Sequence, residues 1–230
     1  MIELLQFAPQ FGLMNASPFC MKVEVFLRLA GLPYRTVDSI PPGTPKSKLP
    51  VLRDQGRSIA DSESILDYLR EGYAAQLPQA LRAPETGTQL LSRRTVEEHL
   101  YFAVLRCRWL DPVAAAQTRH LFDSVPAPVR GLVFGMVRRK MRRDLWGQGI
   151  GRHDEQCVYG KACADVDAVV AWLGDQPFFA GGEPGSIDAC LYAFVANLIW
   201  VPFETPIKAH ALASAPLLAY AERMRERVGR

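Results

Sequence analysis

The spacing of hydrophobic positions in the first third of the chain changes from segment to segment, as in a domain that mixes strands and helices. Short apolar or alternating runs predict strands, and apolar residues three and four positions apart predict helices. The predicted strands are residues 2–7, 34–38, 50–54 and 57–60, and the predicted helices are residues 18–30 and 62–70. Gly31 ends the first helix, and the Gln55-Gly56 pair is typical of a hairpin turn. This order predicts a small α/β unit with a mixed sheet.

Beyond residue 88 the strand pattern disappears and longer segments with helical spacing take its place. The predicted helices are residues 89–110, 113–122, 128–146, 154–173, 187–200 and 216–228. The segment between the two parts contains Pro78, Pro84 and Gly87, as a linker would. We therefore predict an α/β domain over residues 1–76, a linker over residues 77–88 and an all-helical domain over residues 89–230.

The composition is that of a globular protein with a sizeable core, at 49% hydrophobic and 22% charged residues. The formal net charge of +3 is small for 230 residues, so bulk charge gives no reason to expect a nucleic-acid partner. The longest apolar stretch is interrupted by Asp188 and Asn197, so we expect no transmembrane segment. Glu3 stands where a secretory signal would carry positive charge, so no such signal is predicted.

The five cysteines are widely spaced and include no Cys-x-x-Cys pair. An odd, scattered set argues against a disulfide framework and predicts a reducing, cytoplasmic environment. The same spacing offers no zinc site, and the four histidines lack the spacing of metal ligands. We therefore expect no bound metal.

The Ser17-Pro18-Phe19-Cys20 segment places a hydroxyl and a thiol at the start of the first predicted helix. Serine followed by proline is a favoured helix start, so capping alone explains Ser17. The chemical alternative is that the helix N-terminus stabilises the thiolate of a bound thiol cofactor. Lowering a thiol pKa from about 8.5 to about 6.5 needs roughly 2.7 kcal/mol, which a hydrogen bond and the helix dipole can together supply.

Cys20 occupies the third position of that helix. A dithiol redox site would need a second cysteine in place of Ser17, which disfavours disulfide exchange here. Cys20 is then either a small inward-facing core residue or a single reactive thiol that forms a mixed disulfide.

Two further pairs of residues have both a structural and a ligand-binding interpretation. Leu49-Pro50 is either the entry to an edge strand or a cis bond that turns the backbone of Leu49 towards an extended peptide ligand. Asp61-Ser62 is a normal helix cap, but an acid and a hydroxyl at a helix N-terminus also suit the amino and carboxylate groups of an amino-acid-like ligand.

The one strong charge cluster is the run Arg138-Arg139-Lys140-Met141-Arg142-Arg143. Apolar residues interleave with this run, so an amphipathic surface segment is expected rather than a nucleic-acid groove. They are Val133, Phe134, Met136, Val137 and Met141. Contact with an anionic membrane or an acidic protein is the alternative interpretation.

Taken together, the segment at Ser17, the proline before the third strand, the Asp61-Ser62 pair and the helical second half resemble the glutathione S-transferase superfamily. The resemblance covers essentially the whole chain and implies a thioredoxin-like N-terminal domain followed by an all-α domain. One position departs from the family pattern. The helical domain usually has Ser or Thr three residues before Asp188, where this chain has Gly185, so the cap falls on either Gly185 or Ser186.

Within the superfamily the chain most resembles the metaxin-like branch, which includes the failed-axon-connections proteins and bacterial relatives. The residues that carry this likeness are 17–20, Lys22, Glu24, 30–34, 45–50, 59–62, 147–153 and 186–189. The Gly-Gln-Gly-Ile-Gly-Arg-His sequence at 147–153 is the most distinctive of them. No strand is predicted before it, so it is not expected to be a phosphate loop.

The resemblance implies a glutathione-binding site in the N-terminal domain. Ser17 would stabilise the glutathione thiolate, the backbone of Leu49 before a cis Pro50 would pair with the cysteinyl part, and Asp61 and Ser62 would bind the γ-glutamyl end. A small hydrophobic electrophile would be the second substrate, and a homodimer is expected.

Two alternative functions stay open at this point. The first is a non-catalytic binding or assembly module that keeps the fold. The second is a glutathione-dependent reductase that uses Cys20 through a mixed disulfide.

Overall fold

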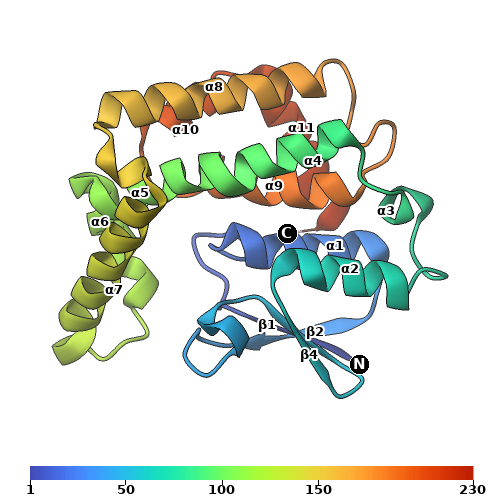
Figure 1. Cartoon of the computed structure of the whole chain (residues 1–230), viewed down its shortest axis with the longest axis horizontal. Coiled ribbons are helices and arrows are strands. Elements are labelled where there is room, and N and C mark those ends of the chain that lie inside the picture. Colours follow the sequence, from blue (N-terminus) through green and yellow to red (C-terminus); the bar gives the residue numbers. More distant parts are fainter. Residues whose placement is uncertain (230) are drawn as a thin grey trace. The chain divides into compact units, whose positions relative to one another are not determined.

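The computed structural model describes residues 1–229. The N-terminal part of the chain forms a four-stranded mixed sheet (Figure 1). Its strands are β1 (Ile2–Gln6), β2 (Tyr34–Asp38), β3 (Val51–Asp54) and β4 (Arg57–Ala60), in the order β2-β1-β3-β4. β1 and β2 are parallel, whereas β3 runs antiparallel to both β1 and β4. Each predicted strand is therefore confirmed, and so is the mixed sheet.

Helices α1 (Pro18–Ala30) and α2 (Ser62–Gly72) lie on the same face of this sheet (Figure 1). α1 ends at Gly31, which adopts the left-handed conformation at φ 65° that glycine takes up without steric cost. Nearly all side chains of α1 are buried, because α2 and the sheet cover one side and α9 (Ser186–Ile199) packs along another.

The rest of the described chain is helical, and no strand follows Ala60 up to residue 229. Besides α9, its elements are α3 (Gln79–Arg82), α4 (Gly87–Arg94), η2 (Thr95–Leu100), α5 (Tyr101–Leu110), α6 (Pro112–Thr118), η3 (Arg119–Phe122), α7 (Ala127–Gln148), η4 (Ile150–Arg152), α8 (Glu155–Leu173), α10 (Pro206–Leu212) and α11 (Ala215–Val228). All six helices predicted for this part are present. The first of them is interrupted by the π-helical η2, and α3 and α10 were not predicted. None of the helices in residues 1–229 combines the length and the hydrophobicity needed to cross a bilayer.

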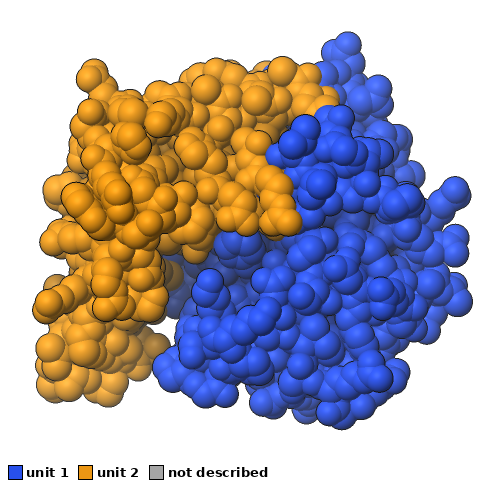
Figure 2. Space-filling view, viewed as in Figure 1, with its two compact units in different colours: residues 1–93, 173–201, 216–230 blue, residues 94–172, 202–215 orange. Residues whose placement is uncertain are grey.

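Two compact units can be distinguished by their internal packing (Figure 2). Unit 1 consists of residues 1–93, 173–201 and 216–230, and unit 2 of residues 94–172 and 202–215. Unit 1 thus contains the sheet, α1 to α3, α9 and most of α4 and α11. Within it, α9 packs on α1. The boundaries at 1–76, 77–88 and 89–230, which follow the type of secondary structure, stay a prediction.

The start of α9 resolves the choice between Gly185 and Ser186 as its cap. Gly185 is the N-cap residue, and the buried Asp188 carboxylate accepts a hydrogen bond from its backbone N–H at 2.9 Å. The same carboxylate also accepts from the backbone N–H groups of Phe179 at 2.8 Å and Ala180 at 3.1 Å. Asp188 therefore fixes the preceding loop to the helix, although residue 185 has no hydroxyl to cap it.

The distinctive glycine-rich segment joins α7 to η4, and two of its glycines have a physical reason. Gly149 ends α7 with φ 112°, a conformation that side chains rarely adopt. A Cβ atom at Gly151 would lie 2.9 Å from the backbone of both Leu145 and Trp146, so only glycine lets the chain pass so close. The segment follows a helix rather than a strand and turns the chain tightly from α7 into η4.

Candidate functional site

Ser17 caps α1, as its sequence context predicts. Its hydroxyl oxygen accepts a hydrogen bond from the backbone N–H of Cys20 at 3.5 Å, and Pro18 follows at the first helical position. The loop before it is held by Asn15, a fully buried side chain whose amide donates to the carbonyl of Phe7 at 2.6 Å and accepts from the N–H of Ser17 at 3.0 Å. Asn15 therefore positions Ser17, which remains half-buried at the helix N-terminus.

The sequence alone does not indicate this role of Asn15, because asparagine in a loop normally indicates only a turn. Its role depends on contacts that are distant in sequence. The Asn197 side chain on α9 donates to the backbone carbonyl of Asn15 at 3.2 Å. Both residues belong to unit 1 and are buried.

Cys20 lies one turn into α1 and has no solvent exposure. Burial raises the pKa of its thiol to about 12, although a hydrogen bond with Ser17 acts in the opposite direction. The environment of Cys20 thus favours the neutral thiol at physiological pH.

The Leu49–Pro50 peptide bond is cis and immediately precedes β3. Leu49 is half-buried and Pro50 is buried. β3 lies between β1 and β4, so the interpretation of this proline as a feature of an edge strand is wrong. Pro50 is tolerated because it stands just before the first residue of the strand.

Asp61 and Ser62 open α2. The Asp61 carboxylate accepts hydrogen bonds from the N–H groups of Glu63 at 3.1 Å and Ser64 at 3.3 Å, so the predicted cap is confirmed. Asp61 is exposed and has φ 89°, an uncommon and strained conformation for a residue other than glycine. Ser62 is buried beside it.

The sheet register brings these three segments to one end of the sheet. Leu5 is paired with Val51, and Val51 is paired with Ala60. The loop that leads to Ser17 leaves the sheet just after Leu5, Pro50 directly precedes Val51, and Asp61 directly follows Ala60. Segments that are far apart in sequence therefore adjoin neighbouring strands at the same end of the sheet, as a common binding site requires.

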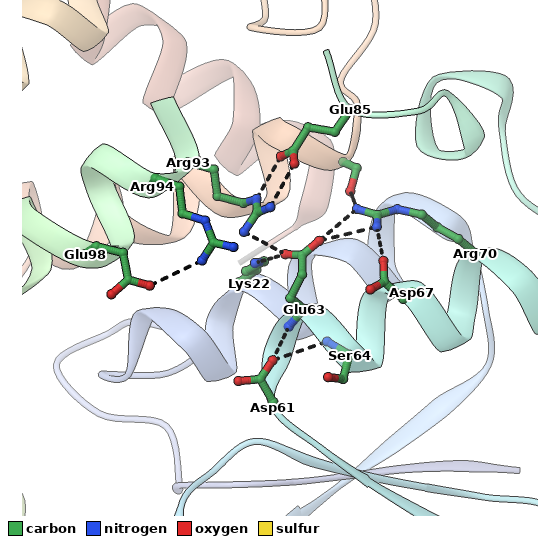
Figure 3. A network of polar contacts seen from close by, with 11 residues as sticks. Lys22, Asp61, Glu63, Ser64, Asp67, Arg70, Glu85, Arg93, Arg94 and Glu98 are labelled. Atoms are coloured by element: carbon green, nitrogen blue, oxygen red, sulfur yellow. Dashed lines mark hydrogen bonds and ion pairs between the residues drawn. The ribbon is translucent and has the colours of Figure 1, made fainter. Parts of the chain in front are cut away.

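A network of charged side chains lies next to Asp61 and was not predicted (Figure 3). The Glu63 carboxylate is 2.6 Å from the ammonium of Lys22, whose side chain is completely buried. The same carboxylate is 3.4 Å from the guanidinium of Arg70 and 3.5 Å from that of Arg93. Glu63 thus ties the first turn of α2 to α1 and to α4.

The two arginines of this network have carboxylate partners of their own. Arg93 binds Glu85 through two hydrogen bonds of 2.8 Å. Arg70 binds Asp67 at 2.7 Å (Figure 3). It also donates to the hydroxyl of Ser186 at 2.6 Å. The network therefore joins α1, α2, α4 and α9 of unit 1 through charge-assisted hydrogen bonds.

The pKa of Glu63 reflects this surrounding positive charge. Burial alone would raise the pKa of its carboxyl, but Lys22, Arg93 and Arg70 outweigh that effect and hold the pKa below its ordinary value of 4.5. Glu63 is therefore ionised at neutral pH and compensates the buried Lys22.

The fold and the arrangement of these segments define a class of protein. Sequence models of the glutathione S-transferase N-terminal domain and of the glutathione S-transferase C-terminal domain match residues 18–114 and 162–224, respectively. The chain belongs to the glutathione S-transferase family.

Individual relatives also place the chain within that family. It is 29% identical to isoprene-epoxide–glutathione S-transferase of Rhodococcus sp. (strain AD45), over 98% of each protein. It is 27% identical to Failed axon connections of Drosophila melanogaster, over 98% of this chain but only 57% of that protein. It is 26% identical to metaxin-1 of Mus musculus, over 95% of this chain and 72% of that protein. These relatives confirm the resemblance to the metaxin-like branch.

Solved structures confirm the fold. A glutathione S-transferase of Ceriporiopsis subvermispora, in complex with glutathione, is similar with a TM-score of 0.64 at 20% identity, over 98% of this chain and 97% of that chain. A beta-etherase from Sphingobium sp. strain SYK-6 is similar with a TM-score of 0.68 at 15% identity, over 97% and 94% of the two chains.

Proposed function

We propose that this protein is a glutathione transferase that activates the glutathione thiol for attack on small electrophiles. The observation that carries the proposal is the register Leu5–Val51–Ala60, which gathers the segments of Ser17, Leu49-Pro50 and Asp61-Ser62 at one end of the sheet. Glutathione is a tripeptide with a thiol, a peptide backbone and an amino-acid-like end. Each of the three segments offers groups that suit one of these parts.

Ser17 is the residue we assign to the thiol. Its hydroxyl stands at the N-terminus of the 13-residue α1, where the helix dipole favours negative charge. A hydrogen bond to a thiolate is worth about 1.5–3 kcal/mol. Together with the dipole this would raise the thiolate fraction at pH 7 from about 3% to about 75%.

The other contacts follow from the chemistry of the tripeptide. The backbone of Leu49 would pair with the cysteinyl part, because it directly precedes the cis bond at the entrance to β3. The exposed Asp61 carboxylate would hold the γ-glutamyl ammonium, and Ser62 at the first position of α2 would hold the γ-glutamyl carboxylate.

The burial of Cys20 argues against the reductase alternative. A mixed disulfide requires an accessible thiolate, and Cys20 has neither exposure nor a low pKa. We therefore assign Cys20 to the core and leave the thiol chemistry to Ser17.

The first electrophile to test is a small epoxide. The support for this class is the likeness to an isoprene-epoxide–glutathione S-transferase over nearly the full length of both proteins. In the proposed reaction the thiolate sulfur forms a bond to a ring carbon as a C–O bond breaks, and the resulting alkoxide takes a proton from water.

Two measurements test the proposal. Calorimetric titration should detect glutathione binding, and mass spectrometry should detect the conjugate when glutathione and an isoprene epoxide are incubated with the protein. Absence of binding at millimolar glutathione would favour the non-catalytic module instead. Disulfide reductase activity that disappears in Cys20→Ser would favour the reductase. Conjugation that is unchanged in Cys20→Ser is the result expected here.

A further inference from the structure

Helix α7 carries the strongest concentration of charge in the chain. Its 22 residues contain six cationic side chains and one carboxylate, so its formal charge is +5, whereas the whole chain carries +3. The charged residues are Arg130, Arg138, Arg139, Lys140, Arg142, Arg143 and Asp144. The remainder of the chain is therefore slightly negative, and the positive charge is a local property of this helix.

One face of α7 is fixed to the neighbouring elements of unit 2. The ring of Phe134 stacks on Trp109 of α5 at a centroid distance of 5.9 Å and meets Phe122 edge-on at 5.7 Å. The Arg138 guanidinium donates to the carbonyl of Trp109 at 2.9 Å, and Leu145 is fully buried. In Figure 1, α7 extends away from α8. It packs on α5, η3 and η4.

The opposite face of α7 is exposed and combines apolar with basic side chains. Leu132, Met136 and Trp146 are 66%, 57% and 58% exposed, respectively. Arg139 and Arg143 lie on the same side of the helix, because the spacings of three and four residues from 132 to 146 follow the helical repeat. We call the residues Leu132, Met136, Arg139, Arg143 and Trp146 the outer stripe of α7.

The cations of this region are poorly compensated within the protein. Lys140 is paired with Asp144, but Arg139, Arg142 and Arg143 have no carboxylate partner among residues 1–229. Arg152 adds another cation, with its guanidinium 5.4 Å above the ring of Trp146. Arg139 and Arg143 lie one turn apart, and their like charges repel each other. An anionic surface would offset this repulsion.

We propose that the outer stripe of α7 binds an anionic phospholipid surface. Basic side chains alone would suit an acidic protein or a nucleic acid equally well. The large exposed side chains of Leu132, Met136 and Trp146 in line with the arginines favour a lipid interface, where apolar groups and tryptophan are buried while arginine meets the phosphates. The helix would lie on the membrane surface and would not cross it.

Vesicle co-sedimentation of the whole protein tests this proposal. One set of vesicles contains phosphatidylcholine only, and the other contains phosphatidylcholine and phosphatidylglycerol in equal parts. We expect binding to the anionic vesicles alone, weakening as salt is added. The double variant Arg139→Gln/Arg143→Gln should bind about thirtyfold more weakly, from about 1 kcal/mol for each basic residue near the surface.

Matched controls separate the stripe from bulk charge and bulk hydrophobicity. Arg57→Gln/Arg82→Gln removes the same charge from exposed positions of unit 1 and should leave binding unchanged. Leu132→Ser/Met136→Ser should weaken binding, whereas Ile40→Ser/Leu91→Ser, at equally exposed apolar positions outside α7, should not.

The proposal is overturned if the protein ignores the anionic vesicles or binds pure phosphatidylcholine equally well. It is also overturned if both arginine variants behave alike. Tighter binding to polyglutamate or to duplex DNA than to anionic vesicles would show that the stripe serves a protein or nucleic-acid partner instead.

Discussion

The hydroxyl oxygen of Ser17 lies 3.5 Å from the backbone nitrogen of Cys20, at the long limit of a capping hydrogen bond. A bond of this length contributes little to the stability of α1. The hydroxyl hydrogen of Ser17 can still be donated to a sulfur bound at the helix N-terminus. Capping therefore does not account for all that this serine can do.

Ser17→Ala should impair catalysis far more than stability. We expect kcat/KM to fall at least about tenfold near neutral pH, because the thiolate loses a charge-assisted hydrogen bond. The loss should shrink at alkaline pH, where glutathione ionises without help. The free energy of unfolding should change by no more than about 1 kcal/mol. The pH dependence of kcat/KM and urea denaturation measure the two effects.

Thr205→Ala is the matched control for this prediction. The Thr205 hydroxyl caps α10 and accepts from the N–H of Lys208 at 3.1 Å, a better cap than that of Ser17. This variant should lose about 1 kcal/mol of stability and keep the pH profile of the parent. If Ser17→Ala also kept that profile, Ser17 would be only a cap.

Asp61→Asn should weaken glutathione binding and leave the fold intact. Asparagine caps a helix as well as aspartate does, so the free energy of unfolding should stay within about 0.5 kcal/mol. The γ-glutamyl ammonium would lose its carboxylate, so the Kd for glutathione should rise about tenfold, the effect of one charge-assisted hydrogen bond. Calorimetric titration measures this constant.

Asp67→Asn provides the comparison within the same helix. Asp67 pairs with Arg70 one turn further along α2, and it is not one of the residues assigned to the ligand. Its substitution should leave the Kd unchanged. Equal Kd values for the Asp61 variant and the parent would remove Asp61 from the proposed site.

Features that depend on neighbouring residues could be predicted from the sequence, whereas features that depend on distant contacts could not. The strands, the cap at Ser17 and the left-handed Gly31 follow from local patterns. The choice of Gly185 as the cap of α9 could be made only from the structure. The Asp188 carboxylate accepts hydrogen bonds from three backbone N–H groups, those of Phe179, Ala180 and Gly185. The short α10 escaped prediction because seven residues are too few to establish a period.

The candidate site divides in the same way. Ser17, Leu49-Pro50 and Asp61-Ser62 are visible in the sequence because each is a local motif. Their meeting at one end of the sheet depends on strand register. Alternating residues indicate which face of the sheet a side chain is on, but not which residue of the next strand it is paired with. The Lys22–Glu63 ion pair spans 41 positions, and a lysine within an apolar helix gives no sign of its partner.

Glu63→Gln should destabilise unit 1 by about 3 kcal/mol, because it removes the carboxylate that compensates the completely buried Lys22. The pKa of Glu63 is lowered in the folded state, so its stabilisation is present above the ordinary value of 4.5 and is lost as the pH falls below it. The difference between parent and variant should therefore be constant near neutrality and shrink in acid. Urea denaturation over a pH series measures it.

Glu98→Gln is the control for this pair (Figure 3). Glu98 lies 3.4 Å from Arg94, and both side chains are more than half exposed. Such a pair is worth less than about 1 kcal/mol, so its loss should hardly move the denaturation midpoint. Equal effects of the two substitutions would contradict the assignment of Glu63 as the anchor of the network.

Gly151 and Gly147 should respond in opposite ways to alanine, although both belong to the glycine-rich segment at residues 147–153. A Cβ atom at Gly151 would lie 2.9 Å from the carbonyl carbon of Leu145 and from the nitrogen of Trp146, and backbone atoms cannot move aside as side chains do. Gly151→Ala should therefore cost about 1–3 kcal/mol. Gly147 lies inside α7 with nothing within 4 Å of its would-be Cβ, so Gly147→Ala should stabilise the helix by up to about 1 kcal/mol. Thermal denaturation measures the change in stability of each variant. A loss of stability in both would mean that the segment needs glycine for more than the close approach at Gly151.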